Sequence, residues 1–336
     1  MSESAVTPPR RGKQLLDATR TYVNESRLRS WWCLFSTLGL LVMVLSCAAL
    51  LPWVPARIAA SVIGALLMVR SFVLFHDYMH GAILNRSWLA KTIFYAYGVI
   101  GLTPPRSWRH AHNYHHGHVG KVDESETGSF KIMTTQMWET ASCIKRLEYR
   151  IIRNPLIILF AYITVFSYAT CLYWFFTRPT KHWDSAIALL AHVSVIVVLW
   201  LTLGFWAVFF AIMLPMGIAS AFGAYLFYAQ HNAEGINILD DDDWTFDQAS
   251  IESSTYMKLG PILRWFTANI GYHHVHHVNH RIPFYRLPAA MAGITELQNP
   301  VVTTLRLRDV VSCLRLKLWN PAQQRLVRLP RGSHSQ

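Results

Sequence analysis

Long apolar runs alternate with polar stretches along the chain, and their lengths predict membrane-spanning helices. Residues 31–53 contain no charged side chain and are long enough to cross a bilayer whose apolar interior is about 30 Å thick. Residues 58–75 return after a turn that contains Pro52 and Pro55, so the two runs predict a helical hairpin. Near the end of the second run, we expect Arg70 to extend its charge toward the membrane surface.

The second half of the chain predicts another hairpin, formed by residues 185–203 and 205–230. The apolar segment 89–103 is too short to span and predicts a re-entrant or interfacial helix. Residues 155–177 could span by length, but the loop that follows carries Arg178 and Lys181, which favours a cytoplasmic location for that loop. We therefore expect residues 155–177 to lie in or on the membrane without crossing it.

Composition narrows the class of protein. Of the 336 residues, 52% are hydrophobic and 15% are charged, compared with about 25% charged residues in ordinary soluble domains. A soluble enzyme and a disordered chain are therefore both disfavoured. The five cysteines form no CxxC pair, which argues against a disulfide scaffold and against a cysteine-ligated metal site. The net charge of +12 comes largely from the two ends and from loops beside apolar runs, so it indicates contact with anionic lipid rather than nucleic acid.

These patterns predict an all-α membrane protein with four transmembrane helices in two hairpins, membrane-embedded or interfacial helices, and a cytosolic helical cap. The predicted parts are a basic cytosolic segment (1–30), a membrane and catalytic domain (31–295) and a basic cytosolic tail (296–336). The tail alternates cations with apolar residues, which predicts a strand or helix along the membrane surface. The same cations could bind an acidic electron-transfer protein. They are Arg306, Arg308, Arg315, Lys317, Arg325, Arg328 and Arg331.

Many of the sixteen histidines are concentrated in three short clusters. HDYMH places two imidazoles four residues apart at the end of the second apolar run, on one face of a helix. RHAHNYHHGH and NIGYHHVHH then repeat an HxxHH pattern at helical spacing, each time beside an apolar segment. This repetition indicates metal ligands rather than surface or core histidines. The candidate ligands are His76, His80, His112, His115, His116, His273, His276 and His277.

His231 ends the last predicted span on the same predicted membrane face, which makes it a ninth candidate ligand. One metal ion takes about four to six ligands, so nine histidines predict two ions. Imidazole suits iron, copper, zinc and nickel, and the alternative is structural zinc with four ligands and the other rings in supporting positions. We expect Asp77 to accept a hydrogen bond from a ligand imidazole, and His274 to point away by helical phase.

HDYMH, HNYHH and HHVHH, together with the QH at the end of the last hairpin and the phrase WFTANIGYHHVHHVNHRIPFYRL, resemble the membrane fatty acid desaturase superfamily, most closely its bacterial-type acyl desaturases. The resemblance covers about residues 60–295. It implies a non-haem centre of two iron ions on the cytosolic face of a helical membrane domain. It also assigns the eight cluster histidines and His231 as iron ligands. Two departures are His280, where many relatives have proline, and the acidic run Asp240 to Asp243.

The resemblance implies O2-dependent desaturation of a fatty acyl chain carried by a lipid, by CoA or by acyl carrier protein. A methylene C–H bond is too unreactive for side-chain acids or bases, so a cofactor must carry the chemistry. No fused electron-transfer motif is present, so the expected donor is a separate ferredoxin or cytochrome-type protein. The expected location is the bacterial inner membrane, with the site on the cytoplasmic side.

Two alternative functions remain at this point. A hydroxylase or other monooxygenase would use the same scaffold and the same histidines. A metal transporter would place ionisable ligands along a path through the membrane. The only histidine inside a predicted span is His192, and no acidic residue accompanies it.

Overall fold

The computed structural model describes residues 9–122, 130–239 and 242–330, and these are mostly helical. Within them, four helices are long and apolar enough to cross a membrane, which agrees with the predicted runs. The last of the four begins as α11 (Phe205–Val208), continues through a π-helical segment (Phe209–Met213) and ends as α12 (Leu214–Gln230). The other three are α2 (Arg27–Leu50), α3 (Val54–Met79) and α10 (Trp183–Leu203).

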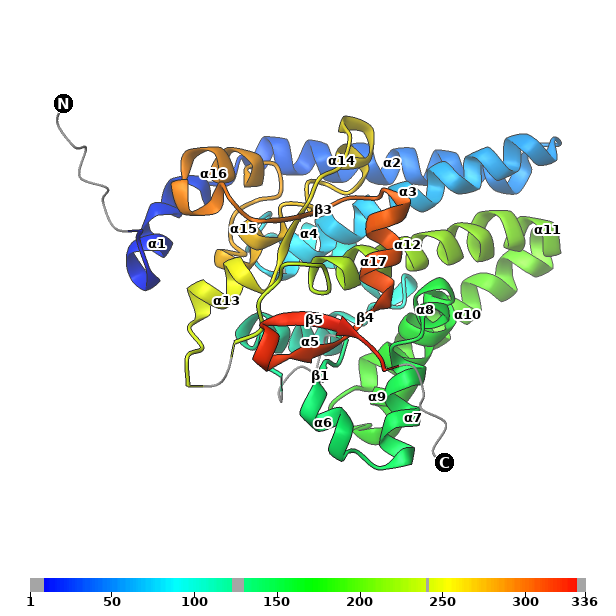
Figure 1. Ribbon diagram of the computed structural model, residues 1–336. Helices are drawn as coiled ribbons and strands as arrows, with labels where there is room; N and C mark the ends of the chain where they lie inside the picture. The colour runs from blue at the N-terminus through cyan, green and yellow to red at the C-terminus, as the bar shows by residue number, and fades with distance from the viewer. Residues whose placement is uncertain (1–8, 123–129, 240–241, 331–336) are drawn as a thin grey trace.

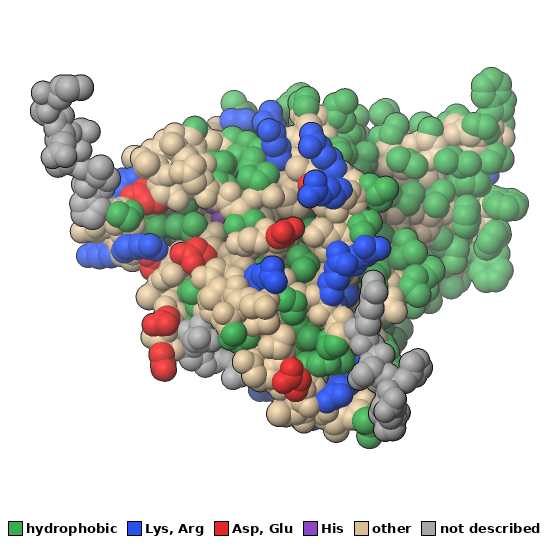
Figure 2. Space-filling view, viewed as in Figure 1, with side chains coloured by type: hydrophobic (Ala, Val, Ile, Leu, Met, Phe, Trp, Pro, Cys, Tyr) green, Lys and Arg blue, Asp and Glu red, His purple; other side chains and the backbone are tan. Residues whose placement is uncertain are grey.

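The long apolar helices lie together and extend away from the rest of the molecule. In Figure 1, α2 lies beside α3 and α10 lies beside α11, and both pairs reach the same end of the molecule. Hydrophobic side chains cover that end in Figure 2, whereas lysine, arginine, aspartate and glutamate gather on the remaining part of the visible face. Leu201 of α10, for example, is 81% exposed. An apolar surface of this extent indicates contact with lipid.

Two further apolar segments are shorter or bent. The segment predicted over 89–103 is α4 (Trp88–Ile100), which has 13 residues and ends before Pro104. Residues 155–177 form no straight helix. Cys143–Leu159 and Tyr162–Thr177 meet at an angle of 119°, and the second of these contains a π-helical segment, Tyr162–Tyr173. The bend places this region against α12 and α10, and the expectation that it does not cross stays a prediction.

The remaining helices are short and build the polar part of the molecule. Of the acidic run noted in the sequence, Asp240 and Asp241 lie outside the described residues. The short α-helices are α1 (Gly12–Ala18), α5 (Pro105–Gly117), α6 (Thr135–Thr140), α7 (Cys143–Ile152), α8 (Pro155–Leu159), α9 (Trp174–Thr177), α13 (Phe246–Glu252), α14 (Pro261–Phe266), α15 (His273–Val278), α16 (Leu287–Gly293) and α17 (Leu307–Arg315). The 3-10 helices are Arg20–Tyr22, Thr295–Leu297 and Pro321–Gln323.

The polar part also contains short strands, which the all-α prediction did not include. In one sheet β4 lies between β1, to which it is parallel, and β5, to which it is antiparallel. In the other, β2 pairs with β3 in parallel. The predicted tail therefore contributes strands to both sheets, because isolated alternating segments such as LKLW need a partner strand to satisfy their backbone. The strands are β1 (Met133–Thr134), β2 (Thr255–Met257), β3 (Val301–Thr303), β4 (Leu316–Asn320) and β5 (Arg325–Arg328).

One side chain expected at the membrane surface is instead buried. The side chain of Arg70 does not extend to the surface, because the residue is only 4% exposed. Its Nε donates to Thr37 Oγ1 at 3.0 Å, its Nη1 donates to the carbonyl of Trp265, and its guanidinium lies 4.1 Å from the centre of the Trp265 ring. A buried arginine needs such partners, because removing its charge from water is costly. Arg70 thus joins α2 and α3 to the region before α15.

Candidate metal centre

The first histidine pair lies where α3 ends. His76 lies in the last turn of α3 and His80 comes directly after that helix, and both side chains are buried. His76 Nδ1 lies 3.2 Å from Asp77 Oδ1, and the other oxygen of Asp77 accepts a hydrogen bond of 2.7 Å from the backbone N–H of Phe284. The structure therefore confirms the predicted position of Asp77. The carboxylate fixes the ring orientation of His76 and leaves Nε2 free to face the centre.

The second cluster lies on α5, and a carboxylate from another helix caps that helix. Asp184, at the start of α10, accepts from the backbone N–H groups of Arg106 at 2.8 Å and Ser107 at 3.1 Å. Its second oxygen accepts from Ser107 Oγ at 2.6 Å. These bonds satisfy N–H groups that have no partner within the helix and place a negative charge at its positive end. The sequence does not predict this role, because Asp184 caps a helix other than its own.

The third cluster forms α15, and a tight turn leads into it. Asn269 adopts a left-handed backbone conformation with φ of 58°, and its side chain donates to the carbonyl of Phe284. Gly271 approaches β2 so closely that an added Cβ would lie 2.5 Å from the carbonyl oxygen of Met257. His274 points away from the other rings, as predicted, and its Nε2 lies 3.0 Å from the carbonyl of Leu297. The remaining three histidines of this cluster face the centre.

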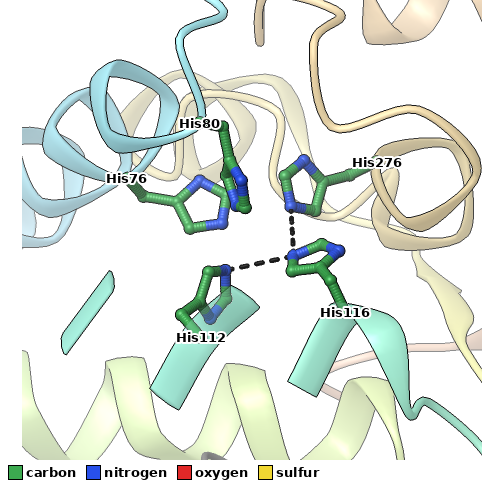
Figure 3. Close-up of side chains that lie close together, drawn as sticks. All are labelled: His76, His80, His112, His116 and His276. Carbon is green, nitrogen blue, oxygen red and sulfur yellow. Dashed lines mark hydrogen bonds between the residues drawn. The ribbon is translucent and has the colours of Figure 1, made fainter. Parts of the chain in front are cut away.

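Five of the predicted ligands converge in a first group. In Figure 3 their rings point toward one shared space from three parts of the chain, the end of α3, α5 and α15. One nitrogen from each ring lies within 4.8 Å of the corresponding nitrogen of every other ring. The Nε2 of His116 lies 3.1 Å from the Nε2 of His112 and 3.1 Å from that of His276. The group consists of His76, His80, His112, His116 and His276.

The other four predicted ligands converge in a second group, His115, His231, His273 and His277. The Nε2 of His231 lies 2.8 Å from that of His273 and 3.2 Å from those of His115 and His277. Its Nδ1 lies 3.0 Å from the carbonyl of Ser253, which orients the ring. The structure thus brings all nine sequence-predicted histidines into two adjacent groups, and α5 and α15 supply rings to both.

The donor set fits metal ions. Burial, followed by repulsion between neighbouring rings, lowers the pKa of the six candidate ligands on α5 and α15 well below the usual value, so each of these rings is neutral at pH 7. A neutral imidazole has one N–H and one lone pair, so Nε2 atoms that converge in threes and fours cannot all hydrogen-bond to each other. When two nitrogens bind one ion at right angles with bonds of about 2.1 Å, they lie about 3 Å apart. Neighbouring Nε2 atoms within the two groups lie 2.8–3.2 Å apart.

Other aromatic side chains line the first group. Trp108 stacks on His112 with ring centres 4.4 Å apart, so it packs against a candidate ligand. The ring of His280 lies 4.6 Å from that of His80 and 5.4 Å from that of His116, and burial lowers its pKa to about 4. Sequence analysis noted His280 only as a departure from relatives. His280 lies just beyond the end of α15, so helical spacing alone could not have placed its ring near the cluster.

His192, the one histidine inside a predicted span, takes no part in either group. Its Nδ1 lies 2.8 Å from the carbonyl of Ile100, and its Nε2 lies 2.5 Å from the hydroxyl of Tyr162. Both nitrogens therefore have partners within the protein. These contacts join α10 to α4 and to the bent segment, and they offer no free ligand for an ion that passes through the membrane.

Comparison with known proteins agrees with this geometry. A family model described as fatty acid desaturase matches residues 51–304. The chain is 31% identical over 272 residues to a fatty acid desaturase of Bacillus subtilis, which covers 80% of this chain and 76% of that relative. It is 22% identical over 278 residues to an sn-1 oleoyl-lipid 12-desaturase of Synechocystis, covering 81% and 77%. Because the family match includes both histidine groups and most of the sequence, the chain belongs to the fatty acid desaturase family.

Proposed function

We propose that this desaturase introduces a double bond into a lipid-bound acyl chain, using O2 and two iron ions held by the nine histidines. The observation that carries the proposal is the convergence of nine imidazoles, eight of them buried, into two adjacent groups. In the balanced reaction, two adjacent methylene groups lose one hydrogen each. One O2, two electrons and two protons complete the reaction, which yields one alkene and two waters.

The irons would supply the oxidising power that breaks an unactivated C–H bond, which no side chain can provide. The protein supplies the ligands, the buried site and the placement of the substrate. The first group would hold one ion and the second group the other, and Asp77 and the carbonyl of Ser253 orient the rings of His76 and His231. Burial of the rings excludes water from the site. Rigid placement of an acyl chain within reaction distance would select the carbon that reacts.

The acyl carrier is proposed to be a lipid. The relative from Synechocystis is named for an oleoyl lipid at the sn-1 position, and the four candidate membrane spans support a site beside a bilayer. Acyl-CoA and acyl carrier protein are the alternatives. The proposed electron donor is a separate ferredoxin or cytochrome-type protein, since the chain has no motif for a haem, a flavin or an iron–sulfur cluster.

We further propose that the four apolar helices cross a bacterial inner membrane as two hairpins, with both histidine groups on the cytoplasmic side. The loop before α10 carries Arg178 and Lys181, which favours the cytoplasmic side. Asp184, immediately after this loop, caps the histidine-bearing helix α5, so the loop and the histidines lie at the same end of the spans. Residues 31–295 would form the membrane and catalytic domain, preceded by a basic segment (1–30) and followed by a tail (296–336).

The test is expression in a host whose lipids lack the expected double bond, followed by mass spectrometry that locates new unsaturation. We expect an alkene on membrane lipid, and about two irons per purified chain. His273→Ala should abolish the product, whereas His274→Gln, which alters the neighbouring ring that points away, should retain it. An alcohol in place of an alkene would overturn desaturation in favour of hydroxylation. Purified protein that binds no iron would overturn the proposed centre.

A further inference from the structure

A pocket opens beside the second histidine group. It is partly open to solvent and has a cavity volume of about 40 Å³. His115 and His231 of the second group contribute to its lining, as do Arg153, Tyr228 and Asn232. Of the described residues that line it, none is an aspartate or a glutamate. The pocket therefore joins the candidate metal centre to a wall that carries positive charge.

Arg153 in this wall is buried and only partly hydrogen-bonded. The residue is 2% exposed, and its guanidinium lies 4.8 Å from the centre of the Tyr228 ring. Nη2 donates to Asn232 Oδ1 at 2.6 Å and to the carbonyl of Leu316 at 3.3 Å. Nε and Nη1 have no acceptor in the described part of the chain, although both are buried. Two donors of a charged group thus lack a partner in the described part of the chain.

A second cation lies beside Arg153. Lys317, which was predicted to lie on the surface of the tail, is instead 8% exposed in β4. Its Nζ donates to the backbone carbonyl of Arg153 and lies 3.4 Å from the hydroxyl of Tyr228. Burial, and next the charge of Arg153, lower the pKa of Lys317 to about 8. Among the described residues, neither cation forms an ion pair with a carboxylate.

Two buried cations without a counter-ion are unusual, because each charge loses several kcal/mol of hydration when it leaves water. The cost is recovered when an anion binds, and arginine suits phosphate because its planar group offers several directed N–H donors. An anion at Arg153 would lie in the pocket that also reaches His115 and His231. The acyl chain attached to such an anion would therefore begin next to the second histidine group.

We propose that Arg153 binds the phosphate group at the head of the acyl substrate. Lys317 positions Arg153 by donating a hydrogen bond to the backbone carbonyl of Arg153. This inference rests on the proposed function and names the part of the substrate that the pocket recognises. A phosphodiester in a phospholipid and a phosphate in acyl-CoA share this chemistry. The contacts that carry the proposal are the two free donors of Arg153 and the absence of a carboxylate among the described lining residues.

The first test measures binding without turnover. Iron-loaded protein in detergent, kept free of O2, is titrated calorimetrically with phosphatidylglycerol and with diacylglycerol that carries the same acyl chains. Arg153→Gln should weaken binding of phosphatidylglycerol about 10- to 100-fold, the effect of a lost charged hydrogen bond, and change binding of diacylglycerol less than about twofold. The matched control is Arg150→Gln, one turn earlier on α7, where the arginine is exposed beside Trp138. It should bind both lipids as the wild type does.

Equal weakening of both lipids by Arg153→Gln, or no weakening at all, would overturn the phosphate site and assign Arg153 a packing role. Iron content and thermal unfolding of each variant show whether it folds. If Arg153→Gln fails to fold, the wild type alone gives the answer. Inorganic phosphate should then compete with phosphatidylglycerol and leave diacylglycerol unaffected, and an absence of competition would overturn the proposal.

Titration with acyl-CoA separates the two sources of phosphate. Tighter binding of phosphatidylglycerol than of acyl-CoA by the wild type, with loss of that preference in Arg153→Gln, supports a lipid headgroup. The reverse preference supports a thioester carrier at the same site. A wild type that binds phosphatidylglycerol through Arg153 but makes no alkene from it in the presence of O2 and electrons would contradict the proposed function and leave the phosphate site standing.

Discussion

The two histidine groups lie side by side but differ in their surroundings. The first contains five buried rings. The carboxylate of Asp77 contacts the ring of His76, and Trp108 stacks on the ring of His112. The second contains four rings, and His231 among them is partly exposed and is oriented by a backbone carbonyl. The pocket borders only the second group through His115 and His231. The second group therefore faces a pocket that the first group does not line.

This difference has a chemical consequence. An ion held by five nitrogens keeps few positions for other ligands, whereas an ion held by four keeps more. We expect the second group to be the side that exchanges ligands with the pocket, and the first group to be the more tightly closed site. The comparison can be tested by removing one ring from each group.

The largest effect should come from His277→Ala in the second group. Loss of one of four nitrogens leaves three, and we expect iron content to fall from about two to about one per chain, with product below about 1% of wild type. His80→Ala leaves four nitrogens in the first group, so after loading with excess iron this variant should still hold nearly two irons. Iron is measured by elemental analysis and product by mass spectrometry.

Two results would break the comparison between the groups. Equal iron loss in His277→Ala and His80→Ala would mean that the number of rings does not set how firmly each ion is held. Retention of two irons by His277→Ala would remove that histidine from the ligand set. His274→Gln serves as the control, because its ring faces the carbonyl of Leu297 rather than either group.

A smaller effect is expected from Asp77→Asn, which acts on the first group alone. The amide can still accept the hydrogen bond from Phe284 N–H, but it cannot hold the His76 ring with a full negative charge. Loss of such an outer contact lowers metal affinity about 10- to 100-fold. Competition with a chelator should show one ion released more easily and the other unchanged. Easier release of both ions would show that the two groups are held as one unit.

Gly271→Ala should disturb the turn that leads into α15, which carries two rings of the second group and one of the first. A Cβ at this position would lie 2.5 Å from the carbonyl of Met257, so the backbone must shift. We expect unfolding of the metal-free protein to cost about 1–3 kcal/mol less than for the wild type. Gly260→Ala meets open space and should change stability by no more than about 0.5 kcal/mol. Similar effects of the two substitutions would contradict the importance of this close approach.

The sequence predicted which histidines converge because helical spacing is local. HxxHH on α5 and α15 places rings on one face, and the apolar runs predict where each helix leaves the membrane. The division of the nine rings into groups of five and four was not predictable. It depends on how three helices cross, which the core packing around Phe75 and Val275 determines. Spacing within one helix carries no information about that crossing.

Sequence patterns also could not predict the contacts that side chains make with partners far away in the chain. Asp184 caps a helix that begins 79 residues earlier in the chain, at Pro105. Arg70 and Lys317 were assigned to the surface because a charged residue is normally exposed, yet both are buried by elements that fold over them. The fold class included no sheet for a related reason, since each strand is short and is stabilised only by a partner strand, although the tail was predicted as a strand or helix. Local pattern predicted the histidines that converge, and tertiary contacts set their surroundings.

The smallest effect concerns an ion pair away from both groups. Arg10 donates to both oxygens of Glu296 at 2.7 and 2.9 Å, and this contact lowers the pKa of Glu296 to about 2 from 4.5. A lowered pKa stabilises the folded state above about pH 4.5, and the stabilisation disappears as pH falls toward 2. Metal-free wild type should therefore unfold at a slightly higher temperature than Glu296→Gln at pH 6, and the difference should vanish near pH 2. Histidine protonation is common to both proteins and cancels in the difference.

Glu296 adjoins Leu297, whose carbonyl holds His274, so the substitution should leave the iron content of both groups unchanged at pH 7. A loss of iron from either group would show that this pair supports the centre through α15.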